Sequence, residues 1–316
     1  MCSVKVGVIG VGGWGKNHLR VLNELGCLAA FCDIDVEKVK RYEEKYRVKG
    51  YPSVDEMLQR EKLDAAVIST PTITHYEIAK KTIASGLHTF VEKPLTLTSK
   101  EGEELLEAAE EQGVILTSGY IERFNPAVTA LKEIITSGRL GEPLLLEFHR
   151  ESKWLGNVRD VGIILDTAVH DIDTARWIFN LEPKSVYART GRIISPHEDF
   201  AAIILGFDEK KTAFIASNWV TPTKVRRLIT VCTGGIVTID FITQEVQIDD
   251  EKGTTIPRRE WREPLLLEMQ HFIECVEGKQ KPIVTARDAV NNTKIAEAAL
   301  LSSKHGVPIY LELSSK

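Results

Sequence analysis

Short apolar runs alternate with longer amphipathic segments along the first 120 residues of the chain. Continuous apolar runs of this length are typical of strands that are covered on both faces. A regular strand–helix alternation favours a doubly wound parallel sheet. The predicted strands span residues 4–9, 28–32, 65–69, 89–91 and 114–117.

Two of the helices between these strands have recognisable starts and ends. Thr74 with Glu77, and Thr98 with Glu101, have the spacing of a capping box. Glycines are expected to follow the last residues of these helices, at Gly86 and Gly113. These signals strengthen the prediction of helices between the parallel strands.

Beyond residue 121 the pattern changes to runs of strands, which predict a mostly antiparallel sheet with helices on one side. The fold class is therefore α/β, with a doubly wound domain over 1–121 and an α+β domain with a large open sheet over 122–316. Helices are expected near 126–137, over "DTAVHDIDTARWIF", and near 263–277 and 286–304. Strands are expected at 144–149, at 308–313, and in six segments between residues 185 and 249, namely "SVYARTGRI", "FAAIILGF", "TAFIASNWV", "RLITVCT", "GIVTID" and "QEVQID".

Composition narrows the function classes. The 316 residues are 43% hydrophobic and 27% charged, and the net charge of −5 argues against binding to nucleic acid or to a membrane surface. Basic residues are scattered, apart from short pairs such as Arg226-Arg227. The five cysteines contain no C-x-x-C, so a disulfide framework or zinc site is not expected, and Cys27 is expected to be a buried thiol. The chain has no signal-peptide pattern and no membrane-spanning apolar run, so a cytoplasmic protein is expected.

A glycine-rich turn follows the first predicted strand and opens a helix. Gly10, Gly12 and Gly15 have the G-x-G-x-x-G spacing that lets a backbone approach the pyrophosphate of a dinucleotide. Asp33 ends the second strand 18 residues after Gly15, where a carboxylate would hold ribose hydroxyls. Asp35 is the better candidate to cap the next helix. A carboxylate at Asp33 would repel a 2′-phosphate, so NAD is favoured over NADP. The other candidate cofactor contacts in the turn are Gly13 and Trp14.

The segment "STPTITH" follows the third predicted strand. It is either a loop that lies against the cofactor or an ordinary β–α connection, and composition does not separate the two. The candidate cofactor-binding residues in this segment are Ser69, Thr70, Pro71 and His75.

A second candidate position lies in "HTFVEKPL", where Pro94 ends the fourth predicted strand. Ligands of open α/β sheets bind at the carboxyl ends of strands. Lys93 at such an end can donate a hydrogen bond to a reacting oxygen, and Glu92 can contact the cofactor or hold Lys93 in place. The alternative is that Lys93 pairs with a surface acid.

A third candidate lies in "ILDTAVHDID". On an α-helix, Asp166 and His170 are one turn apart, Asp173 follows on the same face, and Asp171 points elsewhere. An Asp–His pair on one face can orient an imidazole as a general base. A metal pair and a helix-stabilising surface pair are the alternatives, although no His- or Cys-rich segment supplies a third metal ligand.

These motifs together resemble the glucose–fructose oxidoreductase/inositol dehydrogenase (Gfo/Idh/MocA) family over essentially the whole chain. The resemblance rests on the glycine loop, on "STPTITH", on "EKP" at 92–94 and on the D-x-x-x-H of 166–170. It implies a Rossmann domain with a bound nicotinamide cofactor, and a second domain whose sheet mediates homodimers or homotetramers. It also implies that Lys93 and His170 are the catalytic pair, that Asp166 helps to bind the sugar, and that the Lys93–Pro94 peptide is cis.

Within the family, "GYIERFNPAV" and "RDVGIILDTAVHDID" are most similar to dehydrogenases that act on UDP-N-acetylhexosamines. The resemblance implies NAD-dependent oxidation of the 3-hydroxyl of UDP-N-acetylglucosamine to a keto sugar. Arg123, Asn125 and Arg159 are candidate substrate contacts, with ordinary structural bonding as the alternative. Other functions that remain open are oxidation of a polyol such as inositol, reduction of a keto sugar, an NAD-dependent glycosidase, and a dinucleotide-binding sensor without turnover.

Overall fold

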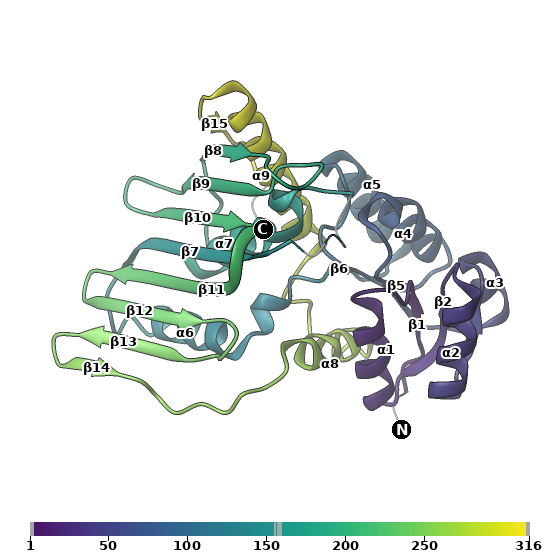
Figure 1. Ribbon diagram of the computed structural model, residues 1–316. Coiled ribbons are helices and arrows are strands. Elements are labelled where there is room, and N and C mark those ends of the chain that lie inside the picture. The colour runs from purple at the N-terminus through teal and green to yellow at the C-terminus, as the bar shows by residue number, and fades with distance from the viewer. Residues whose placement is uncertain (1–2, 155, 157–159, 314–316) are drawn as a thin grey trace. The chain divides into compact units, whose positions relative to one another are not determined.

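The computed structural model describes residues 3–154, 156 and 160–313. The chain forms two compact units, labelled by element in Figure 1. The first consists of Met1–Tyr120 and Leu265–Val290, and the second of Ile121–Pro264 and Asn291–Lys316. The division differs from the predicted boundary at residue 121 in one respect, because Leu265–Val290 packs with the first unit.

The first unit contains a six-stranded sheet of order β3-β2-β1-β4-β5-β6. Every neighbouring pair of its strands is parallel. This order reverses between β1 and β4, and ligands of such sheets bind at the carboxyl ends of the strands near the reversal. The predicted doubly wound sheet is confirmed. The strands are β1 (Val6–Ile9), β2 (Leu28–Cys32), β3 (Lys49–Tyr51), β4 (Ala65–Ile68), β5 (His88–Val91) and β6 (Leu116–Ser118).

The helices of this unit follow the predicted signals with one exception. Thr98 and Glu101 form the predicted capping box, and Gly113 ends that helix in a left-handed conformation. The capping box predicted at Thr74 is wrong, because the Thr74 hydroxyl donates to Pro71 O and to the Thr70 hydroxyl instead. The helices are α1 (Gly15–Glu24), α2 (Val36–Tyr46), α3 (Val54–Arg60), the 3₁₀ turn η1 (Thr72–Thr74), α4 (His75–Ala84), α5 (Ser99–Gln112) and α8 (Pro264–Val276).

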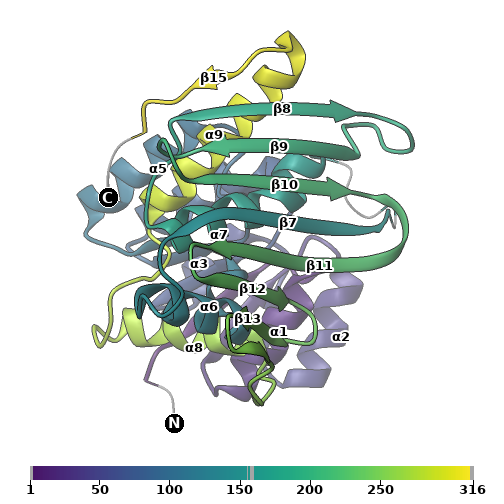
Figure 2. The ribbon, with the colours of Figure 1, turned by 90° about the vertical axis from the view of Figure 1, so that its left-hand side faces the viewer.

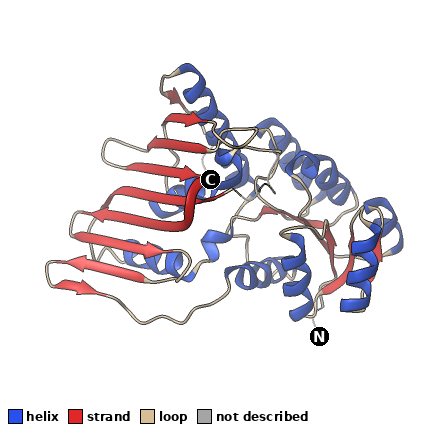
Figure 3. Ribbon diagram, in the orientation of Figure 1, coloured by secondary structure: helices blue, strands red, loops and turns tan. Residues whose placement is uncertain are grey.

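The second unit contains a nine-stranded sheet of order β14-β13-β12-β11-β7-β10-β9-β8-β15. Its strands are antiparallel except for β7 and β10, which run parallel, so the predicted mostly antiparallel sheet is confirmed. Figure 3 shows the strands of this sheet in red. They are β7 (Pro143–Lys153), β8 (Ser185–Gly191), β9 (Phe200–Gly206), β10 (Thr212–Asn218), β11 (Val220–Cys232), β12 (Gly235–Asp240), β13 (Val246–Asp250), β14 (Gly253–Thr255) and β15 (Ile309–Tyr310).

Among the described residues, helices cover one face of this sheet and leave the other without a helix. α6 packs on β12 and β13, and α7 packs on β7 and β10; Figure 2 shows both helices behind the sheet, whose other face is turned toward the viewer. Buried and exposed residues alternate along β9 accordingly. The helical elements are the 3₁₀ turn η2 (Ile121–Phe124), α6 (Pro126–Thr136), the π-helical turn η3 (Ile164–Ala168), α7 (Val169–Phe179) and α9 (Ala286–His305), which begins in the first unit and ends in the second.

The cysteines differ from the expectation at one position. Cys32, Cys232 and Cys275 are free and buried. Cys27, expected to be a buried thiol, is disulfide-bonded. In the part of the chain that the structure describes, every helix is too short or too polar to cross a membrane.

Candidate active site

Four glycines shape the turn between β1 and α1. Gly10 has a φ of +82°, in the left-handed region that residues with side chains rarely adopt. A Cβ atom on Gly15 would lie 2.0 Å from the carbonyl oxygen of Gly10, so only glycine allows this approach of helix to strand. A Cβ atom on Gly12 or Gly13 would meet nothing within 4 Å. The loop therefore leaves open space beside its backbone.

The amino end of α1 adjoins this open space. Trp14 is the N-cap residue, its side chain is 45% exposed and makes no capping hydrogen bond, and the first turn contains no acidic residue. The amide N–H groups of a helix start attract anions, and here no side chain occupies them. The residues present thus fit the pyrophosphate of NAD.

Asp33 links the end of β2 to the glycine loop. Its Oδ2 atom accepts the Val11 N–H at 2.8 Å, and its Oδ1 atom accepts the Asp35 N–H at 2.9 Å. Each carboxylate oxygen has a further lone pair, so the position suits an acceptor for ribose hydroxyls. Asp35 caps α2 through the N–H groups of Glu37 and Lys38, which confirms its predicted role.

The "STPTITH" segment is tied to the strand ends on both sides. The Ser69 hydroxyl donates to Gly10 O at 2.8 Å. The two ring nitrogens of His75 lie 2.9 Å from Pro94 O and 3.0 Å from Thr70 O. Through these contacts His75 bridges two loops. Its side chain is buried, so little of it is accessible to a ligand. We therefore replace its predicted role as a cofactor contact with a role in positioning Thr70 and Pro94.

At the end of β5, Glu92 connects Lys93 to helix α1. Glu92 Oε1 lies 2.7 Å from His18 Nε2, and both side chains are buried. Glu92 Oε2 accepts the Lys93 backbone N–H at 3.1 Å. Of residues 91–96 only Lys93 is not buried, and the Lys93–Pro94 peptide is cis, as the resemblance implied. Glu92 thus holds the backbone of Lys93, which was one of the two roles considered for it.

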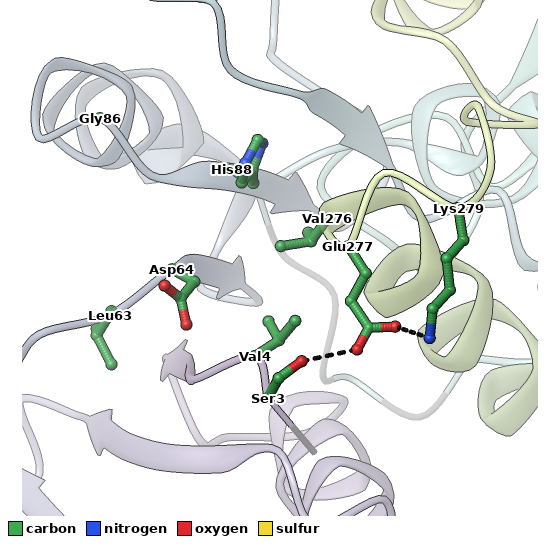
Figure 4. Close-up of a pocket in the computed structure, with 9 residues that line it drawn as sticks. All are labelled: Ser3, Val4, Leu63, Asp64, Gly86, His88, Val276, Glu277 and Lys279. Atoms are coloured by element: carbon green, nitrogen blue, oxygen red, sulfur yellow. Dashed lines mark hydrogen bonds and ion pairs between the residues drawn. The ribbon is translucent and has the colours of Figure 1, made fainter.

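A pocket of about 590 Å³ lies near the amino-terminal ends of β1, β4 and β5 (Figure 4). The polar groups that line it bond one another or the backbone. Glu277 accepts from Ser3 at 2.8 Å and pairs with Lys279 at 2.7 Å, and Asp64 accepts the Lys5 N–H. The pocket lies away from the glycine loop and from Lys93, at the opposite ends of the strands.

In the second unit, the D-x-x-x-H motif occupies a helix start that is not purely α-helical. Residues 164–168 form the π-helical turn η3, and α7 follows; π-helical turns occur frequently at functional sites. Between residues 161 and 176 the positions that are not buried are Asp166, Thr167 and His170. The Thr167 hydroxyl donates to Asp166 Oδ2 at 3.0 Å and accepts from Trp219 Nε1 at 3.2 Å. These bonds orient the Asp166 carboxylate.

Asp173 does not share this accessible face, contrary to the prediction from α-helical periodicity. It is 1% exposed and accepts two hydrogen bonds from Arg123, at 2.7 and 2.6 Å. Arg123 is 2% exposed, and Asn125 caps α6 and donates to Phe241 O. The predicted substrate contacts of Arg123 and Asn125 are corrected here, because both are buried and serve the fold. Arg159 lies outside the described residues.

A buried charge cluster lies beneath the accessible face. Arg150 is 3% exposed and donates to Asp171 at 2.7 to 3.0 Å and to Glu122 at 2.9 Å. Burial lowers the pKa of Arg150, but the two carboxylates outweigh it and raise this pKa overall. Burial also raises the pKa of Asp171 despite the opposing charge of Arg150. This ion-paired cluster confirms that Asp171 points away from Asp166.

Two further cations extend this cluster toward solvent. Burial and the charge of Arg150 lower the pKa of Arg226, whereas Glu122, Asp171 and Asp166 act in the opposite direction. The charge of Arg226, together with burial and Arg150, lowers the pKa of Lys224. Neither residue was among the site residues predicted from the sequence. A pattern in the sequence could have identified them. Lys224 and Arg226 occupy even-numbered positions of a strand in which later even-numbered residues, such as Leu228, are buried.

Comparison with known proteins identifies the family. The chain matches "Oxidoreductase family, NAD-binding Rossmann fold" over residues 4–120 and "GFO/IDH/MocA C-terminal domain" over residues 128–238. It is 30% identical to scyllo-inositol 2-dehydrogenase (NAD(+)) of Bacillus subtilis, over 98% of this chain and 97% of that protein. It is 27% identical to UDP-N-acetylglucosamine 3-dehydrogenase of Acidithiobacillus ferrooxidans, over 95% of this chain and 96% of that protein.

Solved structures share the fold of this chain. The Acidithiobacillus ferrooxidans enzyme superposes with a TM-score of 0.89 at 25% identity, covering 96% of this chain and 99% of that one. The WlbA dehydrogenase of Bordetella pertussis, solved with NADH and UDP-GlcNAcA, superposes with a TM-score of 0.85 at 22% identity, covering 98% and 99%. The chain therefore belongs to the Gfo/Idh/MocA family of oxidoreductases, which use NAD and act on CH–OH groups.

Proposed function

We propose that this protein oxidises a ring hydroxyl of a sugar nucleotide, most specifically the 3-hydroxyl of UDP-N-acetylglucosamine, to a ketone. The observation that carries the proposal is the selective exposure of the chemical groups. Lys93 alone emerges from the buried residues 91–96, and Asp166, Thr167 and His170 alone emerge from the buried residues 161–176. Partly exposed side chains in otherwise buried segments can contact a substrate.

In the proposed mechanism, Lys93 and His170 act on the same hydroxyl group. Lys93 donates a hydrogen bond to the hydroxyl oxygen, and His170 takes the hydroxyl proton as general base. Asp166, which accepts a hydrogen bond from the Trp219-bound Thr167 hydroxyl, accepts hydrogen bonds from the sugar. Bound NAD would accept the hydride from the carbon that carries this hydroxyl group. The C–H and O–H bonds are broken and a carbonyl bond is formed.

The position of each proposed cofactor-binding residue indicates which portion of NAD it would contact. The backbone of Gly12, Gly13 and Trp14 would receive the pyrophosphate, and Asp33 the adenosine ribose. Ser69, Thr70 and Pro71 would line the cofactor beyond the switch between β1 and β4. Glu92 and His75 would act by holding the loops on either side of Lys93.

The choice of a nucleotide sugar over a polyol draws on the relatives and on charge. Both a UDP-N-acetylglucosamine 3-dehydrogenase and a scyllo-inositol 2-dehydrogenase resemble this chain over nearly its whole length. Because a diphosphate requires cationic partners and inositol does not, Arg226, which interacts with Asp166, and the neighbouring Lys224 favour the nucleotide sugar. Oxidation of inositol is the second candidate, favoured by the 30% identity to the Bacillus subtilis enzyme.

We also propose that the uncovered face of the large sheet joins copies of the chain into a homodimer or homotetramer. Large apolar side chains lie on this side of the strands, among them Phe200, 37% exposed, and Ile204, 44% exposed. An extended apolar sheet face without a covering layer is typical of an interface.

A spectrophotometric assay tests the proposed reaction. The protein is incubated with NAD and, separately, with UDP-N-acetylglucosamine, N-acetylglucosamine, scyllo-inositol and myo-inositol, while the absorbance of reduced cofactor is followed. We expect the largest kcat/KM with UDP-N-acetylglucosamine. Turnover of an inositol alone would support the second candidate, and no reduction with any UDP-sugar would contradict the proposed substrate.

A further inference from the structure

Two cations of β11, Lys224 and Arg226, have no strong partner among the described residues, and the strand pairing places Arg226 on the helix-covered side of the large sheet. The even-numbered residues Leu228 and Thr230 of this strand are buried against the helices, and Arg226 has the same parity. Arg226 lies directly opposite Arg150 of the neighbouring strand β7, so both guanidinium groups are on the same side. Lys224 is two residues before Arg226 and close enough for the two charges to repel each other.

The carboxylates of this cluster are already engaged by other groups. Glu122 Oε1 accepts from Arg150 at 2.9 Å, and Glu122 Oε2 accepts from Asn125 at 3.1 Å. Arg150 also takes both oxygens of Asp171. Arg226, whose side chain is 39% exposed, approaches Glu122 no closer than 3.9 Å. Within the described residues Arg226 makes no hydrogen bond, and Lys224 forms no ion pair.

This arrangement carries an electrostatic penalty in the free protein. Like charges directly opposite each other on adjacent strands destabilise a sheet. Burial and the charge of Arg150 lower the pKa of Arg226, and the charge of Arg226 with burial lowers the pKa of Lys224, so each cation is disfavoured by a neighbouring cation. An anion placed between the two side chains would remove the repulsion and provide acceptors for their donors.

Arg226 also lies near the segment that contains Asp166. Asp166 is near enough to Arg226 to affect its pKa. Trp219, one residue before β11, donates to Thr167, which bonds Asp166. A ligand that contacts Arg226 would therefore lie near Asp166.

We propose that Lys224 and Arg226 form the subsite that binds the diphosphate of the substrate. This assignment rests on the proposed oxidation of a nucleotide sugar and names the residues that select it. A guanidinium and an ammonium group suit two linked phosphates, because arginine binds phosphate oxygens in a bidentate manner and lysine acts as a point charge. A neutral polyol would leave both charges unanswered.

The test uses the full-length protein and compares three substitutions. Lys224→Gln and Arg226→Gln remove the proposed contacts, alone and together. Arg227→Gln is the matched control, since it removes a neighbouring cation from the opposite face of the same strand. UDP is titrated by calorimetry in the presence of NAD, and kcat and KM are measured with UDP-N-acetylglucosamine and with N-acetylglucosamine.

We expect each subsite substitution to weaken UDP binding and to raise the KM for UDP-N-acetylglucosamine by about 10-fold, with larger effects in the double variant. The values for N-acetylglucosamine, and the UDP affinity of the control, should change less than about 2-fold. The subsite is anchored far from the reacting carbon, so KM should respond more than kcat. Thermal melting and NAD affinity serve to verify that each variant is folded.

The outcomes separate the subsite from the proposed function. If UDP binds and the double variant loses it, but the protein does not oxidise UDP-N-acetylglucosamine, the subsite stands and the proposed substrate fails. If UDP-N-acetylglucosamine is oxidised and UDP affinity is the same in all variants, the substrate stands and the subsite is wrong. Equal losses in Arg227→Gln and Arg226→Gln, or no binding of UDP to the unaltered protein, would also overturn the subsite.

Discussion

The backbone of Lys93 is held by neighbouring residues. The Glu92 carboxylate accepts the Lys93 N–H and is itself held by His18, a buried residue of the helix that begins at the glycine loop. The backbone of Lys93 is thereby coupled to the segment that would bind the cofactor. A fixed backbone limits the region that the Lys93 side chain can reach, and such positioning favours efficient catalysis.

Replacement of Lys93 tests this role at the level of a single residue. We expect Lys93→Ala to lower kcat by about 10²- to 10⁴-fold, because the hydrogen bond to the reacting oxygen is lost. NAD affinity should stay nearly unchanged, since the glycine loop and Asp33 are intact. Steady-state kinetics and a fluorescence titration with NAD measure the two effects. Lys100→Ala is the control for loss of an exposed lysine, and normal turnover by Lys93→Ala would sink the proposed mechanism.

Individual residues were predictable where the backbone pattern determines their role. Gly10 and Gly15 form the tight turn that their spacing indicated, and Asp35 caps α2 as predicted. Arg123 could not be assigned from the sequence, because an arginine is compatible with either a phosphate or a buried carboxylate. Its partner Asp173 is 50 residues away, and only the fold brings the two together.

The capping box at the start of α5 is expected to stabilise this helix. Thr98 Oγ1 accepts the Glu101 N–H at 3.3 Å, and Glu101 Oε2 accepts the Thr98 N–H at 3.1 Å. Thr98→Ala removes one of these bonds and should lower the free energy of unfolding by about 1 kcal/mol. Denaturant titrations followed by circular dichroism measure the difference. Thr98→Ser should retain most of the stability, and an unchanged midpoint in Thr98→Ala would show that the cap contributes nothing.

The carboxylate of Asp199, the last residue before β9, accepts hydrogen bonds from the backbone of the connection between β8 and β9. Burial of Asp199 opposes ionisation, but bonds from the N–H groups of Ile193, Ile194 and Ser195 outweigh it and lower the pKa. A lowered pKa in the folded state adds stability above the unfolded value of about 3.9, and this stability is lost as the pH falls through the folded value.

Asp199→Asn should therefore lower the melting temperature at neutral pH, because an amide oxygen is a weaker acceptor for the three N–H groups. The difference from the unaltered protein should shrink as the pH is lowered below about 4. Thermal melts across this pH range measure both values. A difference that grows toward acidic pH would contradict the assigned role of the carboxylate.

Elements were predicted well where one period dominates the sequence. The strands predicted at 28–32 and 235–240 coincide with β2 and β12. The three-residue strands β3 and β14 were missed, because their runs are too short to establish an alternation. The π-helical turn η3 was predicted as α-helix, since helical periodicity in a sequence does not distinguish the two.

At the scale of the whole molecule, the chain returns to its first unit after building most of the second. Leu265–Val290 belongs to the first unit, where Phe272 of α8 packs against Phe90 of β5. The sequence predicted the helix but not its unit, because an apolar helix face has no signature for the surface that it covers. Such long-range assignment is determined by the three-dimensional packing.

The uncovered sheet face gives a prediction about assembly. Ile204→Glu places a charge on this face and should convert the proposed homo-oligomer into monomers, since burying an unpaired carboxylate is unfavourable. Ile256→Glu is the matched control, because Ile256 is 53% exposed and lies outside the strands of the sheet. Size-exclusion chromatography with light scattering gives the masses. An unaltered protein that is already monomeric would contradict the proposed interface.

The central claim is that hydride leaves carbon 3 of UDP-N-acetylglucosamine for NAD, and isotope transfer tests it most directly. The protein is incubated with NAD and with UDP-N-acetylglucosamine that carries deuterium at carbon 3, and the reduced cofactor is examined by mass spectrometry. We predict one deuterium in the reduced cofactor, and a Lys93→Ala variant that forms little of this product. Reduced cofactor without deuterium, or no reduced cofactor at all, would contradict the claim.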